Sequence, residues 1–144
     1  MPNGDQILAL TGRTELTDAI KDVLALGTGA VAVTVGADGC LVAWPGSGAP
    51  VSLPALEVEV ADTTGCGDGF TAGLLAGLLA GPDPASPDPA GTAPLDAAWL
   101  GLACGALVAT GLGSDAGIES LAQVLDFLSG TQPAVAGRIK EHIA

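Results

Sequence analysis

The chain has 144 residues, enough for one domain, and carries 16 acidic against 4 basic residues, a formal net charge of −12 at pH 7. Phosphate backbones and anionic membranes are held by Lys and Arg, so this balance argues against nucleic acid and membranes as partners. A single histidine, His142, argues against a histidine-rich metal site and a Ser-His-Asp triad. Three widely spaced cysteines and no signal-peptide pattern at the start lead us to expect a cytoplasmic protein.

The predicted elements alternate in type along the chain. Apolar residues at helical spacing after residue 15 predict a first helix that stops at Gly27. Helices are predicted at 16–26, 68–80, 95–110 and 118–128. Strands are predicted at 30–35, 40–44 and, from its strict alternation, 57–60. A tight turn over 36–39 joins the first two strands. This order indicates the α/β class.

A glycine-rich apolar run at 69–81, GFTAGLLAGLLAG, repeats glycine at every fourth position. Its 13 residues fall short of the roughly 20 that span a bilayer, so we predict a tightly packed helix of a soluble protein. The next stretch, 81–94, holds five prolines without an apolar period and predicts a surface linker. No repeat or second core is evident, so residues 1–144 form one unit.

The most informative segment is DTTGCGDGF at 62–70, where a predicted strand meets a predicted helix. Glycines allow successive N–H groups to point at one spot, and the helix adds its positive end, so the segment predicts an anion cradle. Asp68 in the first helical turn has two interpretations that the residues alone leave open. It either stabilises the helix start or serves as a general base beside a phosphate. Two GxGxxA matches, at 27–32 and 67–72, lack the context of a dinucleotide site.

Four segments together resemble one family. Residues 62–75, DTTGCGDGFTAGLL, resemble the DTxGAGD signature of the PfkB-type (ribokinase-like) carbohydrate kinases, with Cys66 where alanine is commoner. TVGADG at 34–39 resembles the family's TxGxxG nucleotide loop, and PNGDQ followed by LTG within 2–12 resembles its PNxxE…LTG region. ALVATGLG at 106–113 resembles the helix and loop beside the adenine pocket. The resemblance implies the C-terminal part of a ribokinase-like three-layer α/β/α fold with an incomplete sheet.

The resemblance also implies a reaction, the transfer of a phosphoryl group from ATP to a sugar hydroxyl. Asp68 would deprotonate the hydroxyl, and the backbone amides of Gly65, Cys66 and Gly67 would form the anion hole. The residues expected at ATP are Thr34, Gly36, Gly39, Gly67 and Asp68. Helix 95–110 has few polar side chains, so adenine recognition there would depend on shape and backbone.

Metal positions follow from the same resemblance. Asp62 and Thr64 match positions that hold a monovalent cation, K⁺, in several members, and turn capping explains them equally well. Asn3 belongs to the region that organises Mg²⁺ indirectly. Gln6 stands where the family has Glu, which removes a charge, and Asp5 is the adjacent carboxylate.

The resemblance leaves part of a kinase unmatched. Family enzymes are longer, and their N-terminal half carries the sugar contacts and the lid, which have no counterpart here. We therefore expect the nucleotide-binding and catalytic half of a sugar kinase, a truncated form, with a sugar or nucleoside substrate that the sequence does not name. A homo-oligomer or the missing half would complete the site. The alternatives are a non-catalytic fragment that binds a nucleotide or a partner, and an inactive remnant.

Overall fold

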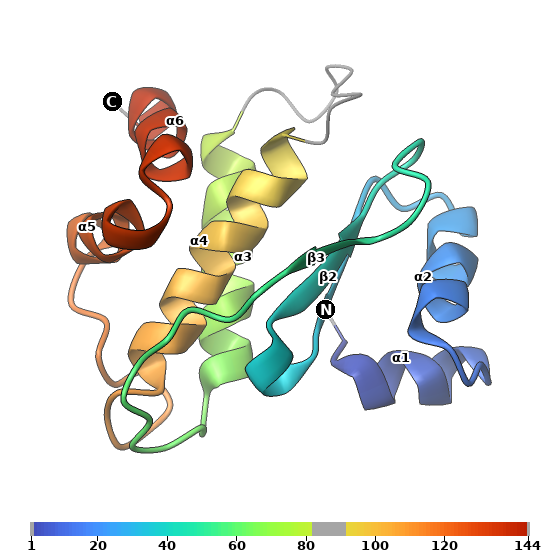
Figure 1. The fold of residues 1–144 in the computed structure, drawn as a ribbon, viewed down its shortest axis with the longest axis horizontal. Coiled ribbons are helices and arrows are strands. Elements are labelled where there is room, and N and C mark those ends of the chain that lie inside the picture. Colours follow the sequence, from blue (N-terminus) through green and yellow to red (C-terminus); the bar gives the residue numbers. More distant parts are fainter. Residues whose placement is uncertain (1, 82–91, 144) are drawn as a thin grey trace.

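The computed structural model describes residues 2–81 and 92–143, arranged in layers around a small sheet (Figure 1). The strands are β1 (Val31–Thr34), β2 (Cys40–Ala43) and β3 (Val51–Leu53), paired antiparallel in the order β1-β2-β3. The helices are α1 (Gly4–Thr11), α2 (Leu16–Ala25), α3 (Cys66–Ala80), α4 (Thr92–Val108), α5 (Leu121–Thr131) and α6 (Pro133–Ile143). A short 3₁₀ turn, η1 (Gly36–Asp38), joins β1 to β2.

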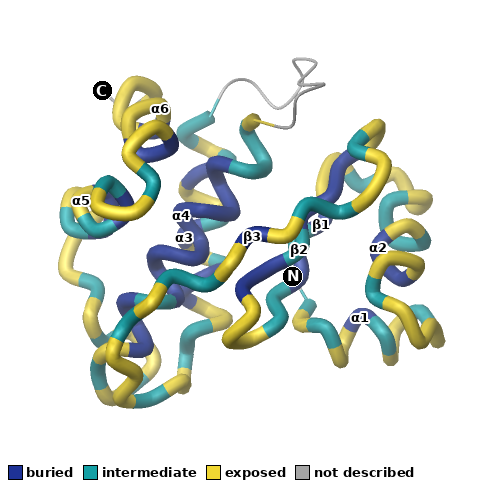
Figure 2. The backbone as a smooth tube through the Cα atoms, in the orientation of Figure 1, coloured by how far each residue is buried: buried dark blue, intermediate teal, exposed yellow. Residues whose placement is uncertain are grey.

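The sheet separates two apolar cores because successive strand side chains point to opposite faces. On β2, Leu41 and Ala43 pack with α1 and α2, and buried Ile7 and Ile20 fill that core. Cys40 and Val42 point to the other face, where α4 covers the sheet and α5 and α6 cover α4. Figure 2 shows the buried residues concentrated on the strands and along α4. The result is a small, incomplete α/β/α arrangement, as the resemblance implies.

Helices α3 and α4 approach closely because glycines line their contact. Gly69, Gly73 and Gly77 are all buried against α4. A Cβ added at Gly73 would lie 2.6 Å from the carbonyl oxygen of Leu100, and one at Gly101 would lie 2.8 Å from the carbonyl oxygen of Phe70. The prediction of a tightly packed helix over the glycine repeat is therefore confirmed. Within the described ranges, no helix combines the length and apolarity that crossing a membrane requires.

Most predicted elements are present, and three elements that the sequence analysis did not predict are also present. The helices near 16–26, 68–80 and 95–110 and the strands near 30–35 and 40–44 are confirmed within a few residues. The unpredicted elements are α1, β3 and α6. The fourth predicted helix was placed three residues too early, since Ser120 caps α5 by accepting a hydrogen bond from the N–H of Gln123 at 3.2 Å.

Two predictions of local structure are wrong. Glu57–Val60 is not a strand, because no described segment pairs with it. Its alternation instead separates Val58 and Val60, which line a cleft, from the exposed Glu57 and Glu59. The predicted linker 81–94 ends too late, since α4 begins at Thr92. Pro94 fits the first turn, where a helix needs no N–H from it. The remaining linker residues, 82–91, lie outside the described residues.

Candidate functional site

An open cleft of about 900 Å³ lies at the junction of the layers. Its walls come from the start of α1, Leu16 at the start of α2, the β1–η1–β2 turn, the extended segment after β3, the start of α3 and the second half of α4. Segments from six parts of the chain thus meet around one space, large enough for a nucleotide-sized ligand.

The start of α3 presents bare backbone to this cleft. Gly65 caps the helix in a left-handed conformation (φ 81°) and packs against the backbone of Ser114. Cys66, Gly67 and Asp68 follow in the first turn and line the cleft. The N–H of Cys66 donates to the carbonyl of Thr63 at 3.3 Å, whereas no described residue accepts from the N–H of Gly67 or Asp68. These two donors, at the positive end of the helix, suit an anion.

Gly67 shows that the space in front of these donors is open. A Cβ at Gly67 would meet no atom within 4 Å, so neither packing nor an unusual backbone angle requires glycine there. A side chain would instead project into the cleft or its margin. The absence of one leaves room for a ligand to approach the main chain.

Asp68 combines exposure with a lack of competing partners. Its side chain makes no hydrogen bond or ion pair with any residue in 2–81 or 92–143. The cleft lining contains one other carboxylate, Asp5, and no Lys, Arg or His. Asp68 is therefore free to accept a proton from a bound molecule, and the charge of a phosphate must be met by N–H groups and by cations that accompany it.

The β1–η1–β2 turn forms the facing wall. Thr34, Gly36 and Gly39, the residues predicted to form a nucleotide loop, all line the cleft. Gly36 has φ 63° and open space where its side chain would be, whereas Gly39 has φ 93° and a Cβ there would lie 2.6 Å from the N of Ala55. Gly39 is thus required by the turn, and Gly36 leaves the wall of the cleft bare.

Asp62 and Thr64 lie beside the cradle without lining the cleft. Asp62 Oδ1 accepts hydrogen bonds from the N–H of Thr64 at 3.0 Å and from its hydroxyl at 2.9 Å. These bonds, together with backbone N–H groups of Gly113 and Thr63, hold the pKa of the Asp62 carboxyl below its usual value. The carboxylate and hydroxyl oxygens are the donor type that K⁺ takes, so the residues fit a monovalent cation, while their mutual bonds give the turn its shape.

The residues near the N-terminus cap a helix. The Asn3 side chain accepts from the N–H of Gln6 at 2.9 Å, and the N–H of Asn3 donates to Gln6 Oε1 at 3.0 Å, which is a reciprocal capping box. Asn3, Asp5 and Gln6 all line the cleft. The sequence analysis predicted no helix here, although the N-x-x-Q spacing is its signal.

An apolar side of the cleft was also missed. Leu56, Val58 and Val60 line it from the extended segment, and Ala106 and Ala109 line it from α4. The N–H of Ala61 donates to the carbonyl of Ala109 at 2.8 Å and ties the two together. The alternation at 57–60 was the available signal. The side of the cleft formed by α4 is therefore smooth and apolar.

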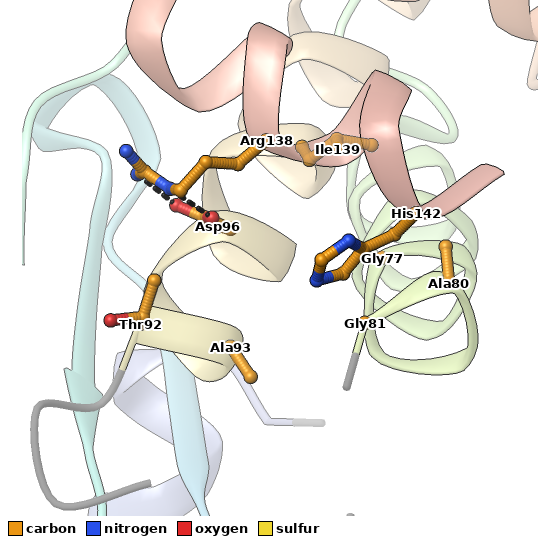
Figure 3. Close-up of a pocket in the computed structure, with 9 residues that line it drawn as sticks. All are labelled: Gly77, Ala80, Gly81, Thr92, Ala93, Asp96, Arg138, Ile139 and His142. Atoms are coloured by element: carbon orange, nitrogen blue, oxygen red, sulfur yellow. Dashed lines mark hydrogen bonds and ion pairs between the residues drawn. The ribbon is translucent and has the colours of Figure 1, made fainter. Parts of the chain in front are cut away.

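A second, smaller cavity of about 60 Å³ lies between the ends of α3, α4 and α6 (Figure 3). The guanidinium of Arg138 donates to both carboxylate oxygens of buried Asp96, at 2.7 and 2.6 Å. The carboxylate raises the pKa of Arg138, mainly through these hydrogen bonds. His142 points into the same space (Figure 3). The pair joins α6 to α4 and is separate from the Asp68 cleft.

The chain is similar to a family of known proteins. The model of the family described as pfkB family carbohydrate kinase matches residues 1–121. Aminoimidazole riboside kinase of Salmonella typhimurium is 32% identical over 138 residues, which are 96% of this chain and 41% of that protein.

Two solved structures have a similar fold. A fructokinase double mutant of Vibrio cholerae O395, in a form bound to fructose, ADP and potassium ion, has a TM-score of 0.75 at 30% identity over 88% of this chain and 39% of that one. Aminoimidazole riboside kinase of Salmonella enterica, complexed with aminoimidazole riboside and an ATP analog, has a TM-score of 0.73 at 30% identity over 89% and 41%. The chain spans about two fifths of each relative. It belongs to the pfkB family of carbohydrate kinases.

Proposed function

We propose that this chain is the nucleotide-binding and catalytic part of an ATP-dependent carbohydrate kinase, with the sugar contacts supplied from outside residues 1–144. One observation carries the proposal most strongly: Asp68 and the unsatisfied N–H donors of the α3 start face the same cleft as the glycine turn at Gly36. Phosphoryl transfer requires a general base, N–H donors for the transferred phosphoryl group and an open surface against which the nucleotide can lie.

The roles follow from this arrangement. Asp68 accepts the proton of the acceptor hydroxyl as that oxygen attacks the terminal phosphoryl group of ATP. The N–H groups of Gly67 and Asp68 donate hydrogen bonds to the oxygens of the transferred group. The N–H of Cys66 joins them when its hydrogen bond to the carbonyl of Thr63 breaks. Thr34 and Gly36 form the wall of the nucleotide site opposite Asp68. The apolar wall near Ala106 and Ala109 accommodates the adenine.

Cations are required because the cleft lining has no basic side chain. Mg²⁺, when bound with the nucleotide, neutralises phosphate charge, and it takes oxygen ligands such as those of Asp5 and the Asn3 region. No group of three or more His, Cys, Asp or Glu residues able to hold a metal occurs in the described part of the chain. This suits a metal that arrives with phosphates. Asp62 and Thr64 would hold K⁺ behind the cradle and fix the turn from which α3 starts.

ADP release from Mg-ATP tests the proposal, measured across a panel of sugars and nucleosides for the wild-type chain, Asp68→Asn and Asp18→Asn. Each is co-expressed with the unmatched part of Salmonella typhimurium aminoimidazole riboside kinase, which supplies the sugar contacts. Asp18 is an exposed acid on α2 and serves as the matched control. General-base catalysis contributes about 10²–10⁴-fold, so Asp68→Asn should reduce acceptor-dependent release by at least about a hundredfold. Asp18→Asn should not change it.

Binding of Mg-ADP, measured by calorimetry, separates the two parts of the proposal. Asp68→Asn should retain binding, since the donors are main-chain groups. A chain that binds Mg-ADP but shows no acceptor-dependent release would be a binding fragment. Loss of Mg-ADP binding with turnover retained in Asp68→Asn would refute the assigned role, and no Mg-ADP binding by the wild-type chain would refute the proposal as a whole.

A further inference from the structure

The end of the cleft formed by α4 and the segment after β3 is apolar. Every lining residue between positions 55 and 60 and between 102 and 109 either has an apolar side chain or is glycine. Val60 belongs to this lining and is 59% exposed, so apolar surface there is open to a bound molecule. A flat aromatic ring, such as the base of a nucleotide, would bury that surface.

The polar side chains of the lining lie at or just before the starts of α1 and α3 and at the end of β1. Figure 1 shows the end of α4 and the segment after β3 on one side of the α3 start, and α1 on the other side. Asp5 on α1 is therefore remote from the apolar end, and Asp68 lies with the N–H donors of the α3 start. The charged groups of the lining are thus separate from the surface that suits a base.

Purine bases differ in the hydrogen-bonding pattern of one edge. Adenine carries a 6-amino donor beside the N1 acceptor, whereas guanine and hypoxanthine carry a 6-oxo acceptor beside an N1–H donor. A site separates these patterns only where fixed polar groups would be left unpaired by the wrong base. The apolar end has no side chain of this kind. The hydroxyls of Thr34 and Thr63 also line the cleft, but a hydroxyl rotates to donate or to accept, so it suits either pattern.

The main chain at this end does not present a fixed pattern either. The carbonyl of Ala109 already accepts from the N–H groups of Ala61 and Asp62, at 2.8 and 3.3 Å. Residues 55–60 make no main-chain hydrogen bond with any described residue, so their N–H donors and C=O acceptors are both free. A segment that offers both kinds of group can complement either purine.

Shape alone gives little selectivity between purines, because they share the same pair of fused rings. A hydrophobic pocket rejects a molecule of matching shape by on the order of a hundredfold at most, whereas a pocket built to hydrogen-bond its ligand reaches about 10⁴–10⁵. We infer that the apolar end of this cleft does not discriminate among purines, so that the kinase uses GTP and ITP as phosphoryl donors as well as ATP.

The inference rests on the proposed function, because it requires a nucleoside triphosphate in this cleft. The reaction is the same with each donor. The acceptor oxygen forms a bond to the terminal phosphorus, the bond from that phosphorus to the bridging oxygen breaks, and the nucleoside diphosphate leaves. Asp68 takes the proton of the acceptor hydroxyl.

Calorimetry of the chain with Mg-ADP, Mg-GDP and Mg-IDP tests the inference, with Mg-tripolyphosphate as a probe that has no base. The three dissociation constants should agree within about tenfold, since no fixed polar group rejects any of the bases. Ala106→Leu, which fills the apolar end, should weaken all three nucleotides and leave Mg-tripolyphosphate binding unchanged. In the acceptor-dependent assay described above, Mg-GTP should yield phosphorylated acceptor at a rate within about tenfold of Mg-ATP.

Val60→Asp should create the selectivity that the wild-type chain lacks. Its carboxylate accepts from the N1–H and 2-amino groups of guanine but opposes the N1 acceptor of adenine, so Mg-GDP should gain at least about tenfold over Mg-ADP. Leu26→Asp adds the same charge at a leucine that is 81% exposed at the end of α2, and it should leave the ratio unchanged.

The possible results separate this inference from the proposed function. A wild-type chain that binds Mg-ADP but prefers one purine by more than about tenfold would overturn the inference alone. A ratio that Val60→Asp leaves unchanged would also overturn it, since the base would not lie at the apolar end. A chain that binds neither the nucleotides nor Mg-tripolyphosphate would refute the proposed function, and the inference with it.

Discussion

The close contact of α3 and α4 predicts a large cost for adding one methyl group. In Gly73→Ala, the new Cβ would lie 2.6 Å from the carbonyl oxygen of Leu100 and 2.9 Å from the Cα of Gly101. Ordinary contact begins at 3.4 Å. The nearest atom and one of the next two are main-chain atoms, the third being the Sγ of Cys104 at 2.8 Å, so the helices must separate by several tenths of an ångström. Such overpacking costs about 3 kcal/mol, and the better helix propensity of alanine returns about 1. We expect a net loss of about 2 kcal/mol in the free energy of unfolding.

Gly137→Ala is the matched control for this prediction. Gly137 lies inside α6, and a Cβ there would meet nothing within 4 Å, so the same substitution should gain up to about 1 kcal/mol. Urea unfolding followed by the fluorescence of Trp44 and Trp99 measures both. The two variants should differ by about 3 kcal/mol, with opposite signs relative to the wild-type chain. If Gly73→Ala is as stable as Gly137→Ala, the steric explanation of the glycine repeat is wrong.

Three further predictions concern titratable and charged groups. Arg138→Ala should lower the free energy of unfolding by about 1–3 kcal/mol, because it leaves the buried Asp96 carboxylate without its ion-pair partner. Asp96→Ala should lower it less, because Arg138 is half exposed and water can solvate its guanidinium. Urea unfolding of both variants tests this order. The pKa of Asp62 is lowered in the folded chain, so its contribution to stability is complete above the unfolded pKa near 4 and is lost as the pH falls through the lower folded value. The difference in stability between wild type and Asp62→Asn should therefore shrink as urea unfolding is repeated from pH 7 down to pH 3, and a constant difference would contradict the assignment. Burial raises the pKa of the Cys40 thiol to about 12 and also raises the pKa values of Cys104 and Cys66, but only Cys66 is partly exposed. A maleimide at pH 8 should therefore modify Cys66 first, as followed by mass spectrometry, and Mg-ADP should slow that reaction.

The sequence could predict the parts of the fold whose signals are local. The glycine repeat predicted the packed face of α3, and the glycines at 36 and 39 predicted the turn that faces Asp68. Strand β3 has only three residues, too few to show a period. Alternation at 57–60 resembles that of a strand, because a segment with one side facing a cleft and the other facing water has the same period as a half-buried strand. Only a partner strand distinguishes the two, and that is not local information.

The candidate site also has parts that the local sequence predicts and parts that depend on distant residues. Gly67 and Asp68 follow from a contiguous motif. The contribution of Asn3 depends on α1, a helix that the sequence analysis did not predict although the N-x-x-Q spacing of its capping box was present. The apolar wall from α4 joins the site only because the N–H of Ala61 donates to the carbonyl of Ala109, a contact between residues 48 positions apart. The motif thus predicted which candidate groups line the cleft, whereas the shape of the cleft required the tertiary structure.

The bare main chain of the anion cradle has an evolutionary consequence. Every residue except proline carries a backbone N–H, so only proline at position 67 or 68 would remove one of these donors. A substitution that adds a side chain would instead block the cradle, since a methyl group at Gly67 or Gly36 would occupy space that is now empty. Under the proposed function, a descendant that lost nucleotide binding in this way would still carry an intact fold and an intact Asp68. A single reverse substitution would then restore the binding.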